Sequence, residues 1–288
     1  MFRITVLFAL LVPAHAIFAQ PSRPLHERET QAAWTALQDR NYVAAIKHAD
    51  NCIVEFWGNA TRRQKELTES RAEIPVGRVT AAQKATIHQS GPLNDVCTCF
   101  YIKARAAHKL GQKDDFTKAL DEVAKLAAAR AWDPVGQFFW APSDAGELLR
   151  FHPELAEKSV HEAYVTLAWA ALNRGDHAKA AEYADKCVAN FHTAALEMER
   201  DLVRRNVRIP TGAVDDATKK AIHANGVLND IGTLLFIKGK ASEARGDKKA
   251  AITAYEAAVS LQHCRCWDEN GWFWSPPEGS GDRLSIIR

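Results

Sequence analysis

The sequence predicts an all-α fold, a solenoid of helical hairpins built from two duplicated units of about 135 residues. The strongest observation is an internal repeat: residues 26–142 match residues 161–277 without a gap, with 39 identities in 117 positions. Within each copy, small and apolar residues recur three or four positions apart, which is the periodicity of a helix face. The chain also holds only 15 Gly and 11 Pro among its 288 residues, which favours long helices.

Composition and charge narrow the functional classes. Hydrophobic residues make up 47% of the chain and charged residues 25%, as in globular proteins and unlike disordered or fibrous ones. Lys and Arg number 37 against 35 Asp and Glu, with no long run of one sign. Because nucleic acids are bound through an excess of positive charge, we expect no nucleic-acid partner.

The first 19 residues predict a secretory signal peptide. Arg3 precedes an apolar run over residues 4–12, and small residues follow at Ala14, Ala16 and Ala19. About ten apolar residues are too few to span a bilayer as a helix, which needs roughly 20. We therefore expect no membrane span, and an exported protein that is soluble in the periplasm or secreted.

The internal match divides the rest of the chain. It predicts a first unit over residues 26–142, a linker over 143–160, a second unit over 161–277 and a C-terminal tail over 278–288. Pro and Gly residues within 142–153 support the linker assignment.

Each unit is predicted to hold two helical hairpins. In chain order they cover residues 30–56, 101–123, 162–191 and 236–259, with turns at 40–42, 111–112, 175–176 and 246–247. The intervening segments, 58–93 and 193–228, each carry an Ile-Pro pair, a nearby Gly and a short amphipathic stretch such as 81–88. We expect these segments to lengthen the second helix of one hairpin and to cross over to the next.

At these hairpins the chain resembles the tetratricopeptide repeat family, as an exported bacterial variant with a duplicated unit. Gly175-Asp176 and Gly246-Asp247 stand at the turns, and Ala180 and Ala251 where the second helices begin. The first two hairpins depart from this pattern, and about 35 residues separate the hairpins within each copy. The resemblance implies a protein-binding solenoid with a concave face.

A repeated polar group invites a catalytic interpretation. His88, Asp95 and Lys103 recur as His223, Asp230 and Lys238, and acid–base chemistry uses such side chains. A structural role is favoured, in which Asn94 or Asp95, and Asn229 or Asp230, cap the helix that follows. We therefore expect no catalytic residues, although spacing alone does not exclude an enzyme.

The unit endings gather five of the eight tryptophans into two short segments. The aromatic residues that both copies share are expected to plug the end of each unit, namely Trp132, Phe138, Trp267 and Phe273. The shared Asp133 and Asp268 are expected to hold a loop turn, and the shared Gly136 and Gly271 to supply a permissive backbone. The aromatic residues whose order differs between the copies are expected to be exposed and are the candidate ligand-binding residues, namely Phe139, Trp140, Trp272 and Trp274.

The six cysteines leave the redox state open. In an exported chain they make disulfides plausible, and the pairing among Cys52, Cys97, Cys99, Cys187, Cys264 and Cys266 cannot be chosen from sequence. Two helical positions separated by two residues point about 200° apart, so Cys97 and Cys99 cannot bind one metal ion together. We expect no metal and no cofactor.

The function predicted from the sequence is non-catalytic binding of a peptide or protein partner in a helical groove. The alternative is a carbohydrate-binding or carbohydrate-processing protein acting on cell-wall glycans or β-glucans through its clustered tryptophans. The Trp-Asp-x-x-Gly-x-Phe-Trp ending supports this alternative, because it resembles that of exported bacterial proteins of which some are named glucanases. A third possibility is a partner that is a second copy of the chain.

Overall fold

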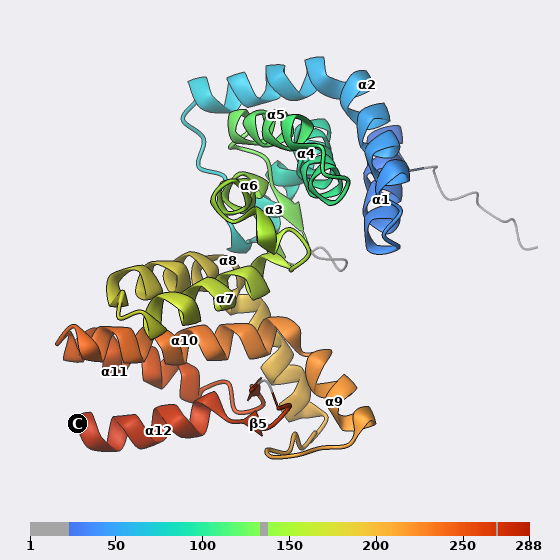
Figure 1. Ribbon diagram of the computed structural model, residues 1–288. Helices are drawn as coiled ribbons and strands as arrows, with labels where there is room; N and C mark the ends of the chain where they lie inside the picture. The colour runs from blue at the N-terminus through green and yellow to red at the C-terminus, as the bar shows by residue number, and fades with distance from the viewer. Residues whose placement is uncertain (1–22, 133–137, 269) are drawn as a thin grey trace, which may run out of the picture.

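The computed structural model describes residues 23–132, 138–268 and 270–288 (Figure 1). The predicted signal peptide, residues 1–19, lies outside these ranges, as do Asp133 and Gly136. We refer below to residues 25–151 as the N-terminal half and to residues 160–287 as the C-terminal half.

The described part of the chain is mostly helical, with twelve α-helices packed as hairpins (Figure 1). Those of the N-terminal half are α1 (Leu25–Gln38), α2 (Tyr42–Glu69), α3 (Ala81–His88), α4 (Gly91–Lys109), α5 (Lys113–Lys125) and α6 (Pro142–Phe151). Those of the C-terminal half are α7 (Val160–Asn173), α8 (His177–Arg204), α9 (Asp216–His223), α10 (Gly226–Ala244), α11 (Lys248–Val259) and α12 (Pro276–Ile287). A short 3-10 helix, η1 (Pro153–Leu155), connects the halves.

The helix boundaries recur at a fixed spacing. Helices α7 to α10 begin and end 135 residues after α1 to α4, respectively. Helices α2 and α8 each contain 28 residues, and the short helices α3 and α9 follow them. The structure thus confirms that the intervening segments lengthen the second helix and then cross over.

Two segments that the sequence assigns to connections are helical. Residues 143–160 contain most of α6, which packs against α5, and also η1. The contact is close, because a Cβ atom at Gly146 would lie 2.8 Å from Cγ1 of Val123. Residues 278–288 form most of α12, which packs against α11. The two helices share few identical residues, which is why the repeat match did not include them.

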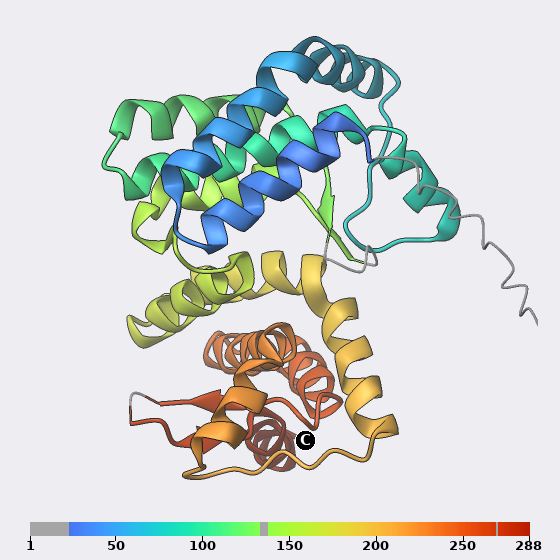
Figure 2. The ribbon, with the colours of Figure 1, turned by 90° about the vertical axis from the view of Figure 1, so that its right-hand side faces the viewer.

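Short strands interrupt the predicted all-α architecture at the end of each half. Strands β1 (Gly77–Arg78), β3 (Phe138–Trp140) and β2 (Ala131–Trp132) form one antiparallel sheet in that order, and β4 (Cys266–Trp267) pairs with β5 (Phe273–Trp274). Helix α8 packs on β1 and β3 and so joins the two halves (Figure 2).

The hairpin turns show why glycine recurs at these positions. Gly111, Gly175 and Gly246 have φ angles of 72°, 77° and 76°, a left-handed conformation that costs glycine little. The first hairpin has Arg40 at this position, with φ of 59°. The caps at the second helices are also local, since Asn41, Asp176 and Asp247 accept hydrogen bonds from backbone N–H groups of α2, α8 and α11.

Candidate functional site

The tryptophans that both copies share pack against a repeated histidine. The His88 ring centroid lies 4.8 Å from that of Trp132 and 5.8 Å from that of Phe139, in edge-to-face geometry. The C-terminal half repeats this cluster, with His223 4.4 Å from Trp267 and 5.7 Å from Phe273. Burial against these rings lowers the pKa of His88. Edge-to-face aromatic packing is therefore the structural role of His88 and His223.

This cluster corrects the predicted alignment of the unit endings. Trp132 pairs with Phe139 across β2 and β3, whereas Trp267 pairs with Phe273 across β4 and β5. The turn of the C-terminal half is therefore one residue shorter, and Phe139 corresponds to Phe273 rather than Phe138. Phe139 is fully buried, so the expectation that it is exposed is wrong. The side chain of Phe138 lies outside the described part of the structure.

The other three candidate aromatic residues lie in different environments. Trp140 is half-buried, with its ring centroid 5.5 Å from that of Tyr101. Trp274 is likewise half-buried, 5.2 Å from Phe236. Trp272 alone among the three has a largely exposed side chain, at 56% of its surface. The expectation of exposure therefore holds for Trp272 and only in part for Trp140 and Trp274.

Asp268 and Gly271 shape the β4–β5 turn. The carboxylate of Asp268 accepts hydrogen bonds from the backbone N–H groups of Asn270 and Trp272, both at 2.9 Å. Gly271 has a left-handed φ of 76°, which a side chain would strain. The local structural role expected for this Asp and Gly is confirmed in the C-terminal half.

Asn94 and Asn229 are not helix caps, contrary to the sequence-based expectation. They lie inside the first turn of α4 and α10, fully buried, and each donates to the carbonyl of an isoleucine in the last turn of the preceding short helix. Asn94 also accepts from the N–H of Arg130, and Asn229 from the N–H of Arg265, both at 2.8 Å. These asparagines therefore join three segments.

Arg130 and Arg265 complete this arrangement, and the sequence analysis did not single them out. The guanidinium of Arg130 donates to the carbonyls of Ile74 and Pro75, and that of Arg265 to those of Ile209 and Pro210. Each guanidinium also donates to two carbonyls within the three residues that precede the arginine. We call Asn94, Arg130 and their counterparts Asn229 and Arg265 the crossover clamp. Each residue of the clamp is the same amino acid in both copies, and this is the sequence signal by which the clamp could be found.

Asp95 and Asp230 bind histidines of the first helix in each half. The Nδ1 atom of His26 lies 2.5 Å from Oδ2 of Asp95, and that of His161 lies 2.5 Å from Oδ2 of Asp230. The hydrogen bond that His26 donates to the Asp95 carboxylate raises the pKa of His26. Burial raises the pKa of Asp230, against the opposing effect of His161. These aspartates pair across the helices and do not cap them.

The repeated group proposed for acid–base chemistry is not assembled into one site. Asp95 contacts His26 rather than His88, and Lys103 pairs with Asp50 at 2.6 Å. The structure thus gives each member of the group a different partner.

A second His-containing arrangement also lacks the geometry of a catalytic triad. Ser159 Oγ lies 3.2 Å from Nδ1 of His161, the same nitrogen that faces Asp230. In a triad the nucleophile and the carboxylate use opposite nitrogens of the imidazole. Ser159 instead caps α7, where its Oγ accepts from the N–H of Glu162.

All six cysteines are free thiols in the structure, so the predicted disulfides are not present. Five are buried within the helical core. Burial raises the pKa of Cys97, Cys187 and Cys264, which keeps these thiols protonated and unreactive. Among the described residues, no three His, Cys, Asp or Glu side chains are arranged to hold a metal ion.

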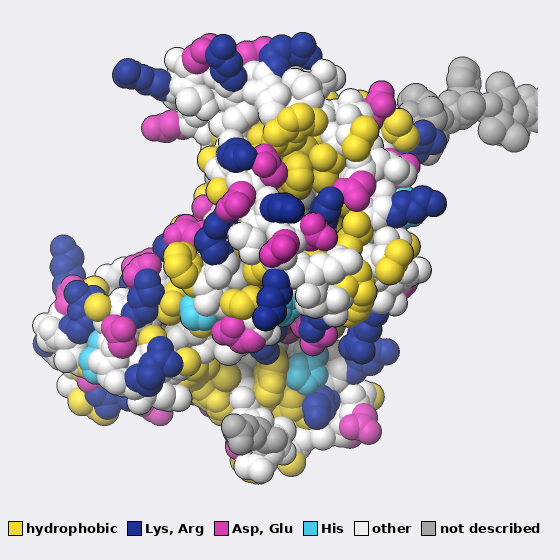
Figure 3. Space-filling view, turned by 45° about the horizontal axis from the view of Figure 1, so that its top comes forward, with side chains coloured by type: hydrophobic (Ala, Val, Ile, Leu, Met, Phe, Trp, Pro, Cys, Tyr) yellow, Lys and Arg dark blue, Asp and Glu magenta, His cyan; other side chains and the backbone are white. Residues whose placement is uncertain are grey.

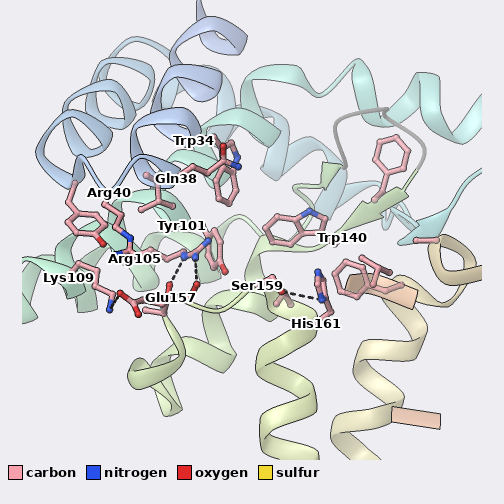
Figure 4. Close-up of a pocket in the computed structure, with 18 residues that line it drawn as sticks. Trp34, Gln38, Arg40, Tyr101, Arg105, Lys109, Trp140, Glu157, Ser159 and His161 are labelled. Atoms are coloured by element: carbon pink, nitrogen blue, oxygen red, sulfur yellow. Dashed lines mark hydrogen bonds and ion pairs between the residues drawn. The ribbon is translucent and has the colours of Figure 1, made fainter. Parts of the chain in front are cut away.

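A cavity lies where the two halves meet (Figure 4). We call it the junction pocket; its volume is about 720 Å³, within the range of ligand sites. Helices α1, α4 and α7, strand β3 and the segment before α7 provide most of its walls. Aromatic rings from three of these elements turn toward it, namely Trp34, Tyr101 and Trp140 (Figure 4).

Arg105 fixes one side of the junction pocket. Its guanidinium carbon lies 5.9 Å from the ring centroid of Trp34 and 5.7 Å from that of Tyr101, which allows cation–π attraction. Its Nε donates to the carbonyl of Ala156 at 2.7 Å, and Nη2 to the two following carbonyls. Arg105 therefore ties α4 of the N-terminal half to the segment that leads into α7.

Charge in the pocket is predominantly positive. Arg40, Arg105 and Lys109 line it, against the single carboxylate of Glu157. Lys109 pairs with Glu157 at 2.5 Å and lowers the pKa of that carboxyl. The two arginines remain as excess positive charge beside the aromatic rings, a combination suited to a ligand with both apolar and acidic groups.

The molecular surface carries charges of both signs with hydrophobic side chains between them (Figure 3). None of the helices in the described part of the chain is long and apolar enough to cross a membrane.

Comparison with known proteins gives one family. The model of the tetratricopeptide repeat matches residues 161–189 and 232–262. No curated protein and no solved structure matches the chain. The matched segments contain the α7–α8 turn and the α10–α11 turn, the two hairpins whose Gly-Asp turns carried the resemblance. The C-terminal half of the chain therefore contains two tetratricopeptide repeats.

Proposed function

We propose that the protein is an exported, non-catalytic scaffold that binds a segment of a protein partner in the junction pocket. The observation that carries this proposal is the aromatic pocket between the two halves, next to a repeat of the tetratricopeptide type. Such repeats form protein-binding surfaces by stacking helical hairpins.

The pocket offers both affinity and orientation. Trp34, Tyr101 and Trp140 would bury an apolar side chain of the partner, and rigid aromatic faces are frequent at the centres of interfaces. Arg40 and Arg105 would pair with a carboxylate nearby. The partner segment is therefore expected to combine an apolar side chain with an acidic one.

Export and duplication form part of the proposal. Export is supported by the basic, apolar and small-residue order of residues 1–19. Duplication of a unit of about 135 residues is supported by the identical spacing of four helices and by the repeated crossover clamp. One copy of the unit would then supply α4 to the junction pocket and the other would supply α7.

The test is selection of peptides from a displayed random library by the chain without residues 1–19, followed by titration of the selected peptides. We expect them to be acidic and to contain aromatic or aliphatic residues. Trp140→Ala should raise their dissociation constant at least about tenfold, the loss typical of an interface anchor. Circular dichroism and urea unfolding would show that this variant folds.

Arg40→Gly provides a milder variant of the pocket. It introduces the glycine that the third hairpin has at Gly175, so it suits the left-handed backbone while removing one charge. We expect binding to weaken about two- to fivefold, with the difference vanishing in high salt. Trp272→Ala, at a residue that does not line the pocket, is the matched control and should leave binding unchanged. Peptides that bind both pocket variants as tightly as the parent chain would overturn the proposal.

A glycan-binding function is the second candidate, and the exposed indoles of Trp267 and Trp272 favour it. They expose 38% and 56% of their surface on one short hairpin, and aromatic faces of this kind can stack on sugar rings. β-Glucan or peptidoglycan fragments should then change tryptophan fluorescence in the parent chain and not in Trp272→Ala. No change at millimolar fragment would exclude this candidate.

A further inference from the structure

The contact between the two halves has a counterpart that is left uncovered at the end of the molecule. In the N-terminal half, Gly77 of β1 pairs with Phe139 of β3, and α8 lies against them. A Cβ atom at Gly77 would lie 3.3 Å from the carbonyl oxygen of Ala189 and 3.6 Å from that of Asn190. The backbone of α8 therefore approaches this glycine closely.

The C-terminal half repeats the strands without the covering helix. Gly212 pairs with Phe273 of β5 through two backbone hydrogen bonds, as Gly77 pairs with Phe139. Above Gly212 lies the indole of Trp272, 3.6 Å from the Cβ position. No helix of the described chain packs here as α8 packs on β1 and β3. We call Gly212, Lys219, Gly271 and Trp272 the terminal hairpin surface.

Helix α2 is the counterpart of α8 and presents the equivalent face to solvent. Val54 corresponds to Ala189 and is 83% exposed, more than any other large hydrophobic side chain whose exposure the structure describes. Gly58, one turn further along, has no atom within 4 Å of its Cβ position. Glycine inside a helix is destabilising relative to alanine. No contact with the described residues requires glycine here, whereas an external side chain would fit above it.

Unpaired charges of opposite sign accompany the two surfaces. Glu55 adjoins Val54 on α2 and corresponds to Asn190 of α8. Lys219 has its Nζ atom 3.9 Å from the Cβ position of Gly271, in the terminal hairpin surface. Neither charge forms an ion pair with another described residue. If α2 of a second copy lay on the β4–β5 hairpin as α8 lies on β1 and β3, Glu55 of that copy would be on the same side of the hairpin as Lys219.

We infer that the chain associates head to tail, with α2 of one copy lying on the terminal hairpin surface of the next. The two surfaces stand at opposite ends of the molecule, α2 at the top of Figure 1 and β5 near the bottom. Trp272 would pack over Gly58, and Glu55 would pair with Lys219. Because the two contacting surfaces differ, each added copy leaves one free, and the association continues beyond a dimer.

Sedimentation velocity of the chain without residues 1–19, over about 1 to 500 µM, tests this inference. We expect the weight-average mass to rise with concentration past that of a dimer. Glu55→Lys and Lys219→Glu should each reduce association at least tenfold, because each places like charges in contact. An equimolar mixture of the two variants should recover association, because the charge on α2 of each variant is then opposite to the charge on the terminal hairpin surface of the other.

Lys84→Glu is the matched control, because Lys84 is the counterpart of Lys219 in the half whose strands α8 already covers. It should associate like the parent chain. A parent chain that stays monomeric at 500 µM would overturn the inference, as would a mixture no more associated than its components. A closed dimer with no larger species would also overturn it. These outcomes leave peptide binding in the junction pocket untouched, since none of the substituted residues lines that pocket.

Discussion

The two halves of the molecule fill the same interior spaces with different side chains. At one position α4 has Cys97, opposite Ala129, and both are fully buried. The C-terminal half has Gly232 and Cys264 at the equivalent positions, and a Cβ atom at Gly232 would lie 2.3 Å from the Cys264 Sγ. The sulfur atom belongs to α4 in the N-terminal half and to the segment before β4 in the C-terminal half, and the space between them is filled in both halves. The fold therefore constrains the combined volume of the two residues more than the identity of either one.

A second exchange follows the same rule on a larger scale. Ala104 and Leu120 in the N-terminal half correspond to Gly239 and Tyr255 in the C-terminal half. A Cβ atom at Gly239 would lie 2.3 Å from Cε1 of Tyr255, so the tyrosine ring occupies the space that the alanine methyl group would need. By contrast, the crossover clamp and the His–Asp pairs are unchanged between the halves. These two polar arrangements are thus kept residue by residue, whereas the two apolar pairs are kept as a combined volume.

The largest expected effect comes from breaking the shared network. Arg130→Met and Arg265→Met should each lower the free energy of unfolding by at least about 3 kcal/mol. Each substitution leaves several carbonyls without their hydrogen-bond donor, at about 1 to 3 kcal/mol per buried group. Urea unfolding measures both values. A loss below about 1 kcal/mol in either half would show that the clamp is not a shared requirement.

Converting one half toward the other tests the volume rule. Gly239→Ala should destabilise the protein by about 1 to 3 kcal/mol, because the added methyl group overlaps the Tyr255 ring. Adding Tyr255→Leu, which reproduces the Ala104 and Leu120 pair, should recover at least half of that loss. Thermal and urea unfolding of the four variants of this cycle give the coupling energy. If the changes in unfolding free energy of the two single variants simply add up in the double variant, the volume rule is contradicted.

The His26–Asp95 pair should make stability depend on pH in a defined direction. The hydrogen bond that His26 donates to the Asp95 carboxylate raises the pKa of His26 in the folded state. Its contribution is therefore complete below the unfolded pKa of about 6.5 and is lost as pH rises through the folded value. We expect roughly 1.5 kcal/mol, typical of a hydrogen bond to a charged group. Urea unfolding from pH 5 to 9 should show this slope in the parent chain and a smaller one in Asp95→Asn.

The smallest expected effect concerns the hairpin turns. Arg40→Gly should raise the free energy of unfolding by up to about 1 kcal/mol, because Arg40 adopts a φ of 59° that disfavours a side chain. Gly175→Ala, at the equivalent turn, should lower it by a similar amount. Equal stability in both variants would mean that the two turns do not differ in strain.

Local patterns predicted much of the helical architecture. Periodicity and the turn residues indicated the hairpins, and the amphipathic stretch at 81–88 is α3. The unit endings were harder, because a turn shorter by one residue moves every side chain of a strand to the other face. For that reason Phe139 was assigned to the surface when it is in the core.

The polar networks and the junction pocket could not be predicted from local patterns. His26 and Asp95 are 69 residues apart, and Arg130 lies 55 residues from Pro75. Nothing periodic marks contacts over such distances, although both histidines and both arginines are identical in the two copies. The junction pocket belongs to no single copy of the repeat, since Trp34 and His161 reach it from different halves.

Hydrogen–deuterium exchange with and without a selected peptide tests the central claim most directly, namely that binding takes place where the two halves meet. Protection is expected in residues 34–38, 101–109 and 156–161, which line the junction pocket. The β4–β5 hairpin should exchange as it does in the free chain. Protection confined to residues 266–274, or spread over neither region, would contradict the claim.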